Sequence, residues 1–270
     1  MRKAIGIFAL AALVPCTLSA QLLTEGPVTN GHYHVSASDV AAHERFWGDT
    51  LGGEVDTYLN DIPIFKFPDA LVFLLESSPD GPSVGSSVDH IGFAVPDLRA
   101  MVDRVTAAGY EMVTEAGSPP GAQIVDHIRI IDDGGPVSAI AYVLGPDEVK
   151  VELLERRGQQ RSIVSDHVHF FGPDNEQMRA WYAEHFGAVI RPGPQPGFVA
   201  ADLPALALNF TSTDAEIAGT QGRALHHIGF EIDGLEAFAA DLEAKGIEFD
   251  VPYSELPEAD LAYALLTDCL

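Results

Sequence analysis

The sequence is poor in positive charge. Its 270 residues include 15 lysines and arginines against 40 aspartates and glutamates, a formal net charge of −25. Such a surface repels phosphate backbones and anionic lipids, so we expect no nucleic-acid partner and no membrane-surface role. No apolar run beyond the first twenty residues is long enough to span a bilayer. The composition is otherwise that of a soluble globular protein.

Cysteine is also scarce, with only Cys16 and Cys269. Cys16 lies in a segment with a positive start, an apolar run over Ala4–Val14 and small residues up to Ala20. This pattern predicts a secretory signal peptide over residues 1–20; a lipoprotein signal is a poorer alternative, because a proline precedes the cysteine. We therefore expect an exported protein, periplasmic or extracellular. It would have no internal disulfide and no membrane insertion after signal cleavage.

The chain repeats one short pattern four times. Each copy begins with a histidine at the head of an apolar run, continues through a helical pattern and closes the helix with a glycine. In three copies an aspartate, a good helix N-cap, follows seven residues after the histidine. The histidines, caps and closing glycines are His32, Asp39 and Gly52; His90, Asp97 and Gly109; His167, Asp174 and Gly187; and His227, Gly234 and Gly246.

Short strand-like runs follow each helix, so every copy reads as a strand, a helix and about three strands. His32 and His167 are 135 residues apart, and His90 and His227 are 137 apart, which indicates a duplicated pair of modules. We expect an α+β chain of four βαβββ modules. The polar connector Arg156–Ser165 marks the boundary between a first domain over residues 28–155 and a second domain over residues 165–270.

Folding does not require a histidine at the head of a strand, because valine or threonine serves a strand better. One such histidine is usually a half-buried strand residue. Duplication also copies residues that have no role, so the four are not independent evidence. A divalent cation held by two neutral imidazoles needs an anionic ligand as well. Glu152, on the strand Val149–Leu154, fits that need, although an exposed strand residue is the plain alternative.

With these residues in view, the chain resembles the vicinal oxygen chelate superfamily, which includes glyoxalases, bleomycin-resistance proteins and extradiol dioxygenases. The resemblance covers the chain from about residue 30 to residue 270. It is most specific at the strand heads Asp89–Val95 and His227–Phe230 and at the strand end Gly145–Leu153. It implies that two modules pair to form a cupped sheet around one divalent metal, in two tandem domains of this type.

The resemblance also implies the metal ligands. They come from the first strands and from a glutamate on a last strand. By position, they are His32, His90 and Glu152 in the first half, and His167 and His227 in the second half. There the counterpart of Glu152 would fall beyond Leu270, so we expect the second ligand set to be incomplete.

Three further residues are candidates for acid/base catalysis. His34 follows His32 by two positions and so shares its strand face, as His169 does with His167. Each is either an acid/base group or a polar residue lining a wet cleft. Tyr142 precedes Glu152 by ten residues. The extradiol enzymes that the chain resembles often carry an acid/base tyrosine on the strand before the glutamate, and packing is the alternative.

These residues and the resemblance together imply a metal-dependent enzyme. Its cofactor would be one divalent ion, Fe2+, Zn2+, Mn2+ or Ni2+, and its partner a small substrate that chelates the ion through adjacent oxygens. The reaction would be that of a glyoxalase-like lyase or isomerase or of an extradiol-type dioxygenase. The alternative is a non-catalytic protein that sequesters a small molecule, as bleomycin-resistance proteins do.

Overall fold

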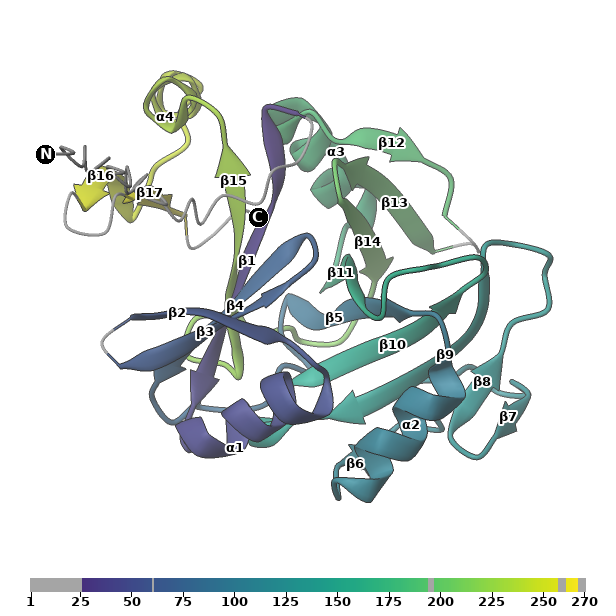
Figure 1. Cartoon of the computed structure of the whole chain (residues 1–270). Helices are drawn as coiled ribbons and strands as arrows, with labels where there is room; N and C mark the ends of the chain where they lie inside the picture. The colour runs from purple at the N-terminus through teal and green to yellow at the C-terminus, as the bar shows by residue number, and fades with distance from the viewer. Residues whose placement is uncertain (1–25, 60, 194–196, 257–260, 267–270) are drawn as a thin grey trace, which may run out of the picture.

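The computed structural model describes residues 26–266, apart from residues 60, 194–196 and 257–260 (Figure 1). The predicted signal peptide and both cysteines lie outside the described residues. None of the described helices is long and apolar enough to cross a membrane.

The elements follow the predicted order of strand, helix and further strands. The first module contains β1 (Val28–Ala37), α1 (Val40–Glu44), a π-helical turn (Arg45–Thr50), β2 (Glu54–Leu59), β3 (Ile62–Phe67) and β4 (Ala70–Glu76). The second contains β5 (Val88–Val95), α2 (Leu98–Ala107), β6 (Glu111–Met112), β7 (Ile124–Val125), β8 (Ile128–Ile130), β9 (Val137–Leu144), a 3-10 turn (Pro146–Glu148) and β10 (Lys150–Arg156).

The second half repeats this order with fewer strands among its described residues. The third module contains β11 (Val164–Gly172), α3 (Asn175–Phe186), β12 (Val189–Arg191), β13 (Phe198–Leu203) and β14 (Leu206–Ser212). The fourth contains β15 (Leu225–Ile232), α4 (Leu235–Ala244), β16 (Val251–Leu256) and β17 (Leu261–Leu265). The mixed α+β architecture is therefore confirmed.

The predicted helix caps are also confirmed. The carboxylate of Asp39 accepts a hydrogen bond from the backbone N–H of Ala42, and Asp97 and Asp174 cap α2 and α3 in the same way. These bonds satisfy N–H groups that the first turn of a helix leaves free. Gly187 ends α3 in the left-handed conformation with φ 72°, which glycine adopts without strain. The repeat read from the sequence is thus a repeat of capped helices.

The strands form two large sheets and a hairpin. The five-stranded sheet has the order β15-β1-β4-β3-β2. The main path of the ten-stranded sheet is β12-β13-β14-β11-β5-β10-β9-β8-β7, with β6 paired to β9. In Figure 1, β1 and β15 run beside each other, and β11, β5 and β10 follow one another across the centre. The strands β16 and β17 pair only with each other among the described residues.

The pairing of modules differs from the expected one. From the sequence, modules one and two, which make up the first predicted domain, are expected to share a sheet. Instead, β1 of the first module pairs antiparallel with β15 of the fourth, and β5 of the second pairs antiparallel with β11 of the third. The reason is the short link over residues 157–163, which returns the chain from β10 to the other side of β5. The ten-stranded sheet therefore continues across the link between the two predicted domains.

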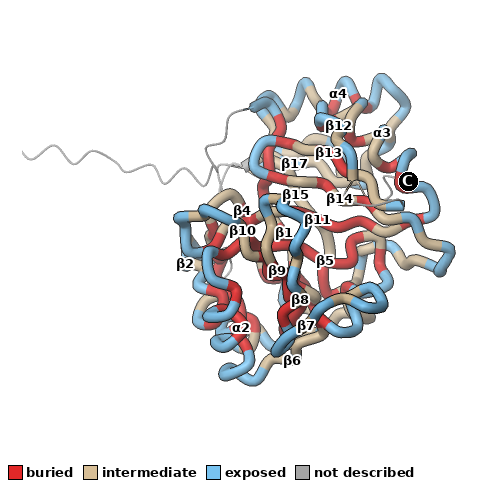
Figure 2. Tube along the Cα trace, turned by 90° about the vertical axis from the view of Figure 1, so that its right-hand side faces the viewer, coloured by how far each residue is buried: buried red, intermediate tan, exposed pale blue. Residues whose placement is uncertain are grey.

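The core lies between the sheets and the helices that cover them. Buried residues follow the central strands, whereas the turns and the outer faces of the helices are exposed (Figure 2). Trp47 is fully buried among Phe46, Phe67 and Phe93. Burial of such aromatic side chains contributes much of the hydrophobic stabilisation of a domain. The two sheets are thus held by a continuous apolar core.

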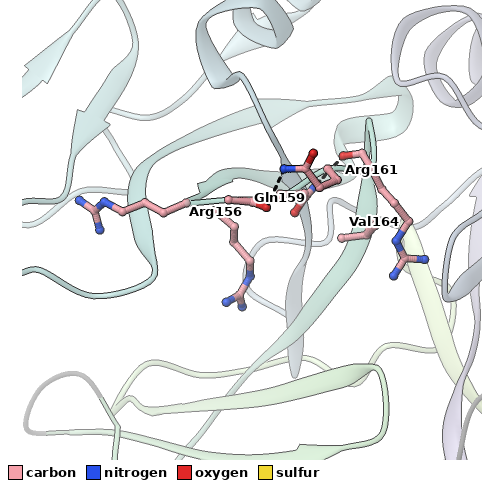
Figure 3. Close-up of a pocket in the computed structure, with 7 residues that line it drawn as sticks. Arg156, Gln159, Arg161 and Val164 are labelled. Atoms are coloured by element: carbon pink, nitrogen blue, oxygen red, sulfur yellow. Dashed lines mark hydrogen bonds between the residues drawn. The ribbon is translucent and has the colours of Figure 1, made fainter.

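The link between β10 and β11 lines a surface pocket of about 370 Å³ with arginines (Figure 3). The side chains drawn there extend in different directions rather than converging. Arg156 pairs with Asp166, and Arg161 Nη2 lies 2.8 Å from Asp69 Oδ2. Arg156, at the end of β10, therefore pairs with β11, and Arg161, in the link, pairs with the turn between β3 and β4.

Candidate metal centre

Four buried side chains from three adjacent strands converge at one place. They are His90 on β5, Glu152 on β10, and His167 and His169 on β11, and one ligand atom of each lies within 4.8 Å of all the others. Glu152 Oε2 lies 3.0 Å from His90 Nε2 and 3.3 Å from His167 Nε2. Two ligands at about 2.0–2.1 Å from a tetrahedral Zn2+ are roughly 3.4 Å apart. The observed spacings are therefore those of a coordination shell.

The strand β5 brings these side chains together with those of its two neighbouring strands. Its Gly92 is the register partner of Glu152 on β10 and of His167 on β11, so the three residues form one row. A Cβ atom at position 92 would lie 2.8 Å from His167 Nε2 and closer still to Nδ1 and Cε1. The missing side chain of Gly92 thus allows the imidazole of His167 to lie over β5 and approach Glu152.

A β-bulge with an aspartate lies directly before each of the histidines His90 and His167. Between β5 and β11 the register shifts at Asp89 and again at Asp166, so each is an extra residue in its strand. A bulge redirects side chains that would otherwise alternate between the faces. Asp89 Oδ1 lies 2.6 Å from His90 Nδ1, and Asp166 Oδ1 lies 3.0 Å from His167 Nδ1. With Nδ1 protonated and donating to the aspartate, each histidine presents an Nε2 lone pair to the site.

Each of these aspartates also has a cationic partner from β10. Lys150 Nζ lies 2.7 Å from Asp89 Oδ1, and the Arg156 guanidinium pairs with Asp166. The two pairs offset the negative charge of the outer carboxylates. Glu152, in contrast, forms ion pairs with histidines and with no lysine or arginine among the described residues.

The electrostatics of the group favour a positive charge at its centre. Burial alone would raise the pKa of Glu152, but His167 and His90 hold that pKa well below its usual value. Burial alone would lower the pKa of His167, but Glu152 and Asp166 raise it to about 9. His167 Nε2 is nevertheless buried with no hydrogen-bond partner. An orphaned nitrogen beside a buried carboxylate, in a place that stabilises positive charge, fits a bound divalent cation.

His169 completes the group on the side of the third module. Its Nε2 lies 2.9 Å from Thr211 Oγ1, and its ring stacks on Phe171 at 5.0 Å between centroids. Burial first, and then His90 and His167, lower its pKa well below the usual value. His169 is therefore a neutral imidazole beside the other three side chains.

The structure brings together two of the three side chains predicted as ligands in the first half. His90 and Glu152 come together as expected, but His32 does not join them, because β1 pairs with β15 and not with β5. His167, assigned by sequence to the second half, takes its place. The predicted catalytic residue His34 lies with His32 as well, and the equivalent position beside Glu152 is held by His169.

A second group consists of His32, His34 and His227, in which one ring nitrogen of each residue lies within 4.8 Å of those of the other two. His227, predicted to share an incomplete site with His167, is thus separated from it. Burial and then His34 lower the pKa of His32 to about 3. Burial and then neighbouring imidazoles likewise lower the pKa of His34 to about 4 and that of His227 to about 2. All three imidazoles are neutral at pH 7.

Tyr142 lies beside the first group, as the sequence analysis expects. It is the register partner of Glu152 on β9, it is buried, and its ring centroid lies 5.4 Å from that of His90. Burial first, and then the charge of Glu152, raise the pKa of Tyr142 well above its usual value. The phenol is therefore neutral at physiological pH.

Sequence reasoning missed the supporting residues of the centre. The signal for Asp89 and Asp166 was the aspartate that directly precedes each of two strand-head histidines. Gly92 could have been found because glycine weakens the interior of a strand, so that a glycine two residues after His90 often marks a place where another group approaches closely.

Comparisons with known proteins agree with this geometry. Residues 29–153 match the family model of the Glyoxalase/Bleomycin resistance protein/Dioxygenase superfamily. This part of the chain is therefore a domain of this superfamily. No curated protein sequence matches the chain significantly.

Solved structures share the fold at low sequence identity. Glyoxalase I from Zea mays is 16% identical, with a TM-score of 0.66 over 88% of this chain and 87% of its own. A putative dioxygenase from Bacillus subtilis subsp. subtilis str. 168 is 13% identical, with a TM-score of 0.56 over 84% of this chain and 78% of its own. The fold shared with these structures therefore extends over both halves of the chain.

Proposed function

We propose that this protein is a divalent-metal-dependent enzyme that binds a small substrate through two adjacent oxygens. His90, Glu152 and His167 would hold the cation, with His169 as a fourth nitrogen within reach. The observation that carries the proposal is the buried Glu152 carboxylate, 3.0 Å and 3.3 Å from two imidazole nitrogens, one of them without a hydrogen-bond partner. Fe2+, Zn2+, Mn2+ and Ni2+ all suit this mixed nitrogen and oxygen donor set.

The chain's own residues supply the remaining parts of such a site. Asp89 and Asp166 fix the ring orientation and the tautomer of the two ligand histidines. A bound divalent cation would act as a Lewis acid and stabilise negative charge that develops on a substrate oxygen. Tyr142 keeps its proton and is placed to donate a hydrogen bond at the edge of the site. Phe171 and Phe198 pack against His169 and provide an apolar wall.

The proposed reactions are those of a glyoxalase-like lyase or isomerase or of an extradiol-type dioxygenase. The names of the glyoxalase I and putative dioxygenase neighbours support both classes. The test uses the full chain stripped of metal and reloaded with each of the four cations, Fe2+ under anaerobic conditions. Each form is assayed with methylglyoxal–thiol adducts and, in the presence of oxygen, with catechols.

Two variants make this assay decisive. Glu152→Gln keeps the shape of the side chain but removes the anionic ligand, so we expect it to lose the bound cation and the turnover together. Glu148→Gln changes an exposed carboxylate in the turn that precedes β10 and should behave as the wild type. Turnover that persists in metal-free protein would refute the proposal. Tight ligand binding by metal-free protein without turnover would instead identify a sequestering protein.

We also propose that the protein is exported to the periplasm or the extracellular space. The support is the charged, apolar and small-residue pattern of residues 1–20. N-terminal sequencing of the protein from the exported fraction should begin near Gln21. An intact N-terminus recovered only from the cytoplasm would contradict it.

A further inference from the structure

The second histidine group has the nitrogen spacing of a coordination shell. His34 Nδ1 lies 2.9 Å from His227 Nε2, and His32 Nε2 lies 3.4 Å from the same nitrogen. Nitrogens bound to one tetrahedral Zn2+ at about 2.0–2.1 Å are roughly 3.4 Å apart. Two of the side chains come from β1 and one from β15, so the group is held by paired strands.

The backbone around this group repeats the construction of the first centre. Gly229 on β15 is the register partner of His32, and a Cβ there would lie 2.5 Å from both His32 Nδ1 and Nε2. Gly92 makes the same room for His167. Register shifts again make an extra residue of Gly31 on β1 and of His226 on β15. The arrangement is therefore built into the strands and is not a chance meeting of surface side chains.

The bulged residue His226 takes the part that Asp89 has in the first centre. His226 Nδ1 lies 2.9 Å from His227 Nδ1, as Asp89 Oδ1 lies 2.6 Å from His90 Nδ1. With the proton on His227 Nδ1 and donated to His226, the lone pair of His227 Nε2 faces His32 and His34. This is the outer hydrogen bond that metal-binding histidines usually make.

The donor set, however, differs from that of the first centre. In the first centre, the strand β10 runs parallel to β5 and places Glu152 opposite Gly92, two residues after His90. In the second group, the strand β4 runs parallel to β1 and places Phe73 opposite His34, two residues after His32. The centroid of the Phe73 ring lies 4.9 Å from that of His32 and 5.3 Å from that of His34. Among the described residues, the group contains no carboxylate. Hard cations that demand oxygen ligands are therefore disfavoured.

We infer that His32, His34 and His227 form a second cation site, which binds a late first-row divalent ion such as Zn2+ or Cu2+ through three imidazoles. Imidazole nitrogens suit Zn2+ and Cu2+, whereas Mg2+ and Ca2+ require oxygen donors. All three histidines are only half-buried, and β15 is the edge strand of its sheet in the described part of the chain, so solvent ions have access. The inference does not rest on the proposed enzymatic function.

The test counts Zn2+ equivalents on the full chain after removal of all metal. Wild type should bind two equivalents. Glu152→Gln should bind one, and so should His34→Ala, because each variant damages one site alone. The double variant should bind none. His127→Asn removes an exposed imidazole outside both groups and should keep two equivalents. Millimolar Mg2+ should displace nothing from the second site.

Two further measurements keep the inference falsifiable if His34→Ala folds poorly. His226→Ala should weaken the second equivalent by about 10–100-fold, the usual effect of losing an outer-shell partner. Cu2+ bound to Glu152→Gln should show an electron paramagnetic resonance spectrum with coupling to several imidazole nitrogens. A single wild-type equivalent that is kept in His34→Ala and lost in Glu152→Gln would overturn the inference, and so would a second equivalent that survives in both His34→Ala and His226→Ala at full affinity. A single wild-type equivalent that is lost in His34→Ala and kept in Glu152→Gln would instead count against the proposed function.

Discussion

The glycine at position 92 provides a sharp test of how the first centre is built. In Gly92→Ala, the new Cβ would overlap the imidazole ring of His167, 2.8 Å from Nε2 and nearer to two other ring atoms. Ordinary contacts between heavy atoms are about 3.5–4.0 Å. The ring must therefore retreat by roughly 1 Å or more, which moves Nε2 away from Glu152. Overpacking of this kind costs about 1–3 kcal/mol of folding stability.

The expected results concern both the bound metal and the thermal stability. We expect first-site metal affinity in Gly92→Ala to fall by about 100-fold or more, because a ligand atom leaves bonding distance. The melting temperature should fall by about 2–4 °C for each kcal/mol lost. Metal titration of the stripped protein and differential scanning calorimetry measure the two effects.

Matched glycine variants separate the local effect from a general one. Gly219→Ala adds a methyl group in open space and should change neither quantity. In Gly229→Ala the new Cβ would overlap the ring of His32 in the same way, and the metal affinity of the first centre should not change. The reasoning would be refuted if Gly92→Ala bound the first equivalent as tightly as Gly219→Ala did.

Three further predictions concern residues around the centre and the fold. Asp89→Asn and Asp166→Asn should each weaken metal binding by about 10–100-fold in a metal titration with little change in fold, and unchanged affinity would contradict their orienting role. Tyr142→Phe should lower kcat by about 100-fold while the metal content stays unchanged. If the bound metal were lost in the same proportion as kcat, Tyr142 would have a packing role instead. Asp147→Asn should cost about 1 kcal/mol by urea unfolding at pH 7, since the carboxylate accepts hydrogen bonds from the backbone N–H and hydroxyl of Ser38 and contacts His43. Burial raises the pKa of Asp147, but these hydrogen bonds hold it below its usual value. The stabilisation that they give is therefore present above about pH 4 and is lost as the pH falls further. Only the wild type should show this loss, because the asparagine that replaces Asp147 in the variant does not titrate.

The sequence predicts the modules well because their signals are local. The caps at Asp97 and Asp174, the closing Gly187 and the strand-head histidines all lie within about twenty residues of one another in each copy. Hydrophobic period, capping and turn chemistry act over such distances. His90 follows from the same local pattern, whereas Glu152, 62 residues further along the chain, follows from the need for an anionic ligand and from the family resemblance.

Module pairing could not be predicted in the same way. A strand with histidines at alternate positions, such as His32 and His34, needs a glycine on the partner strand opposite the first histidine, because a Cβ there would overlap the imidazole ring. Gly92 on β5 and Gly229 on β15 are such glycines. Both available partners satisfy this need, so the pattern does not decide between them. The decision comes from the links, where a short connection brings β11 back beside β5. For that reason His167, and not His32, lies beside Glu152.

The most direct test of the first centre is an X-ray anomalous difference map from crystals of the Zn2+-loaded full chain, recorded at the zinc absorption edge. The geometry predicts a peak bonded to His90 Nε2, to a carboxylate oxygen of Glu152 and to His167 Nε2. A map with no peak among these three side chains, or one in which His32 replaces His167 as a ligand, would contradict it.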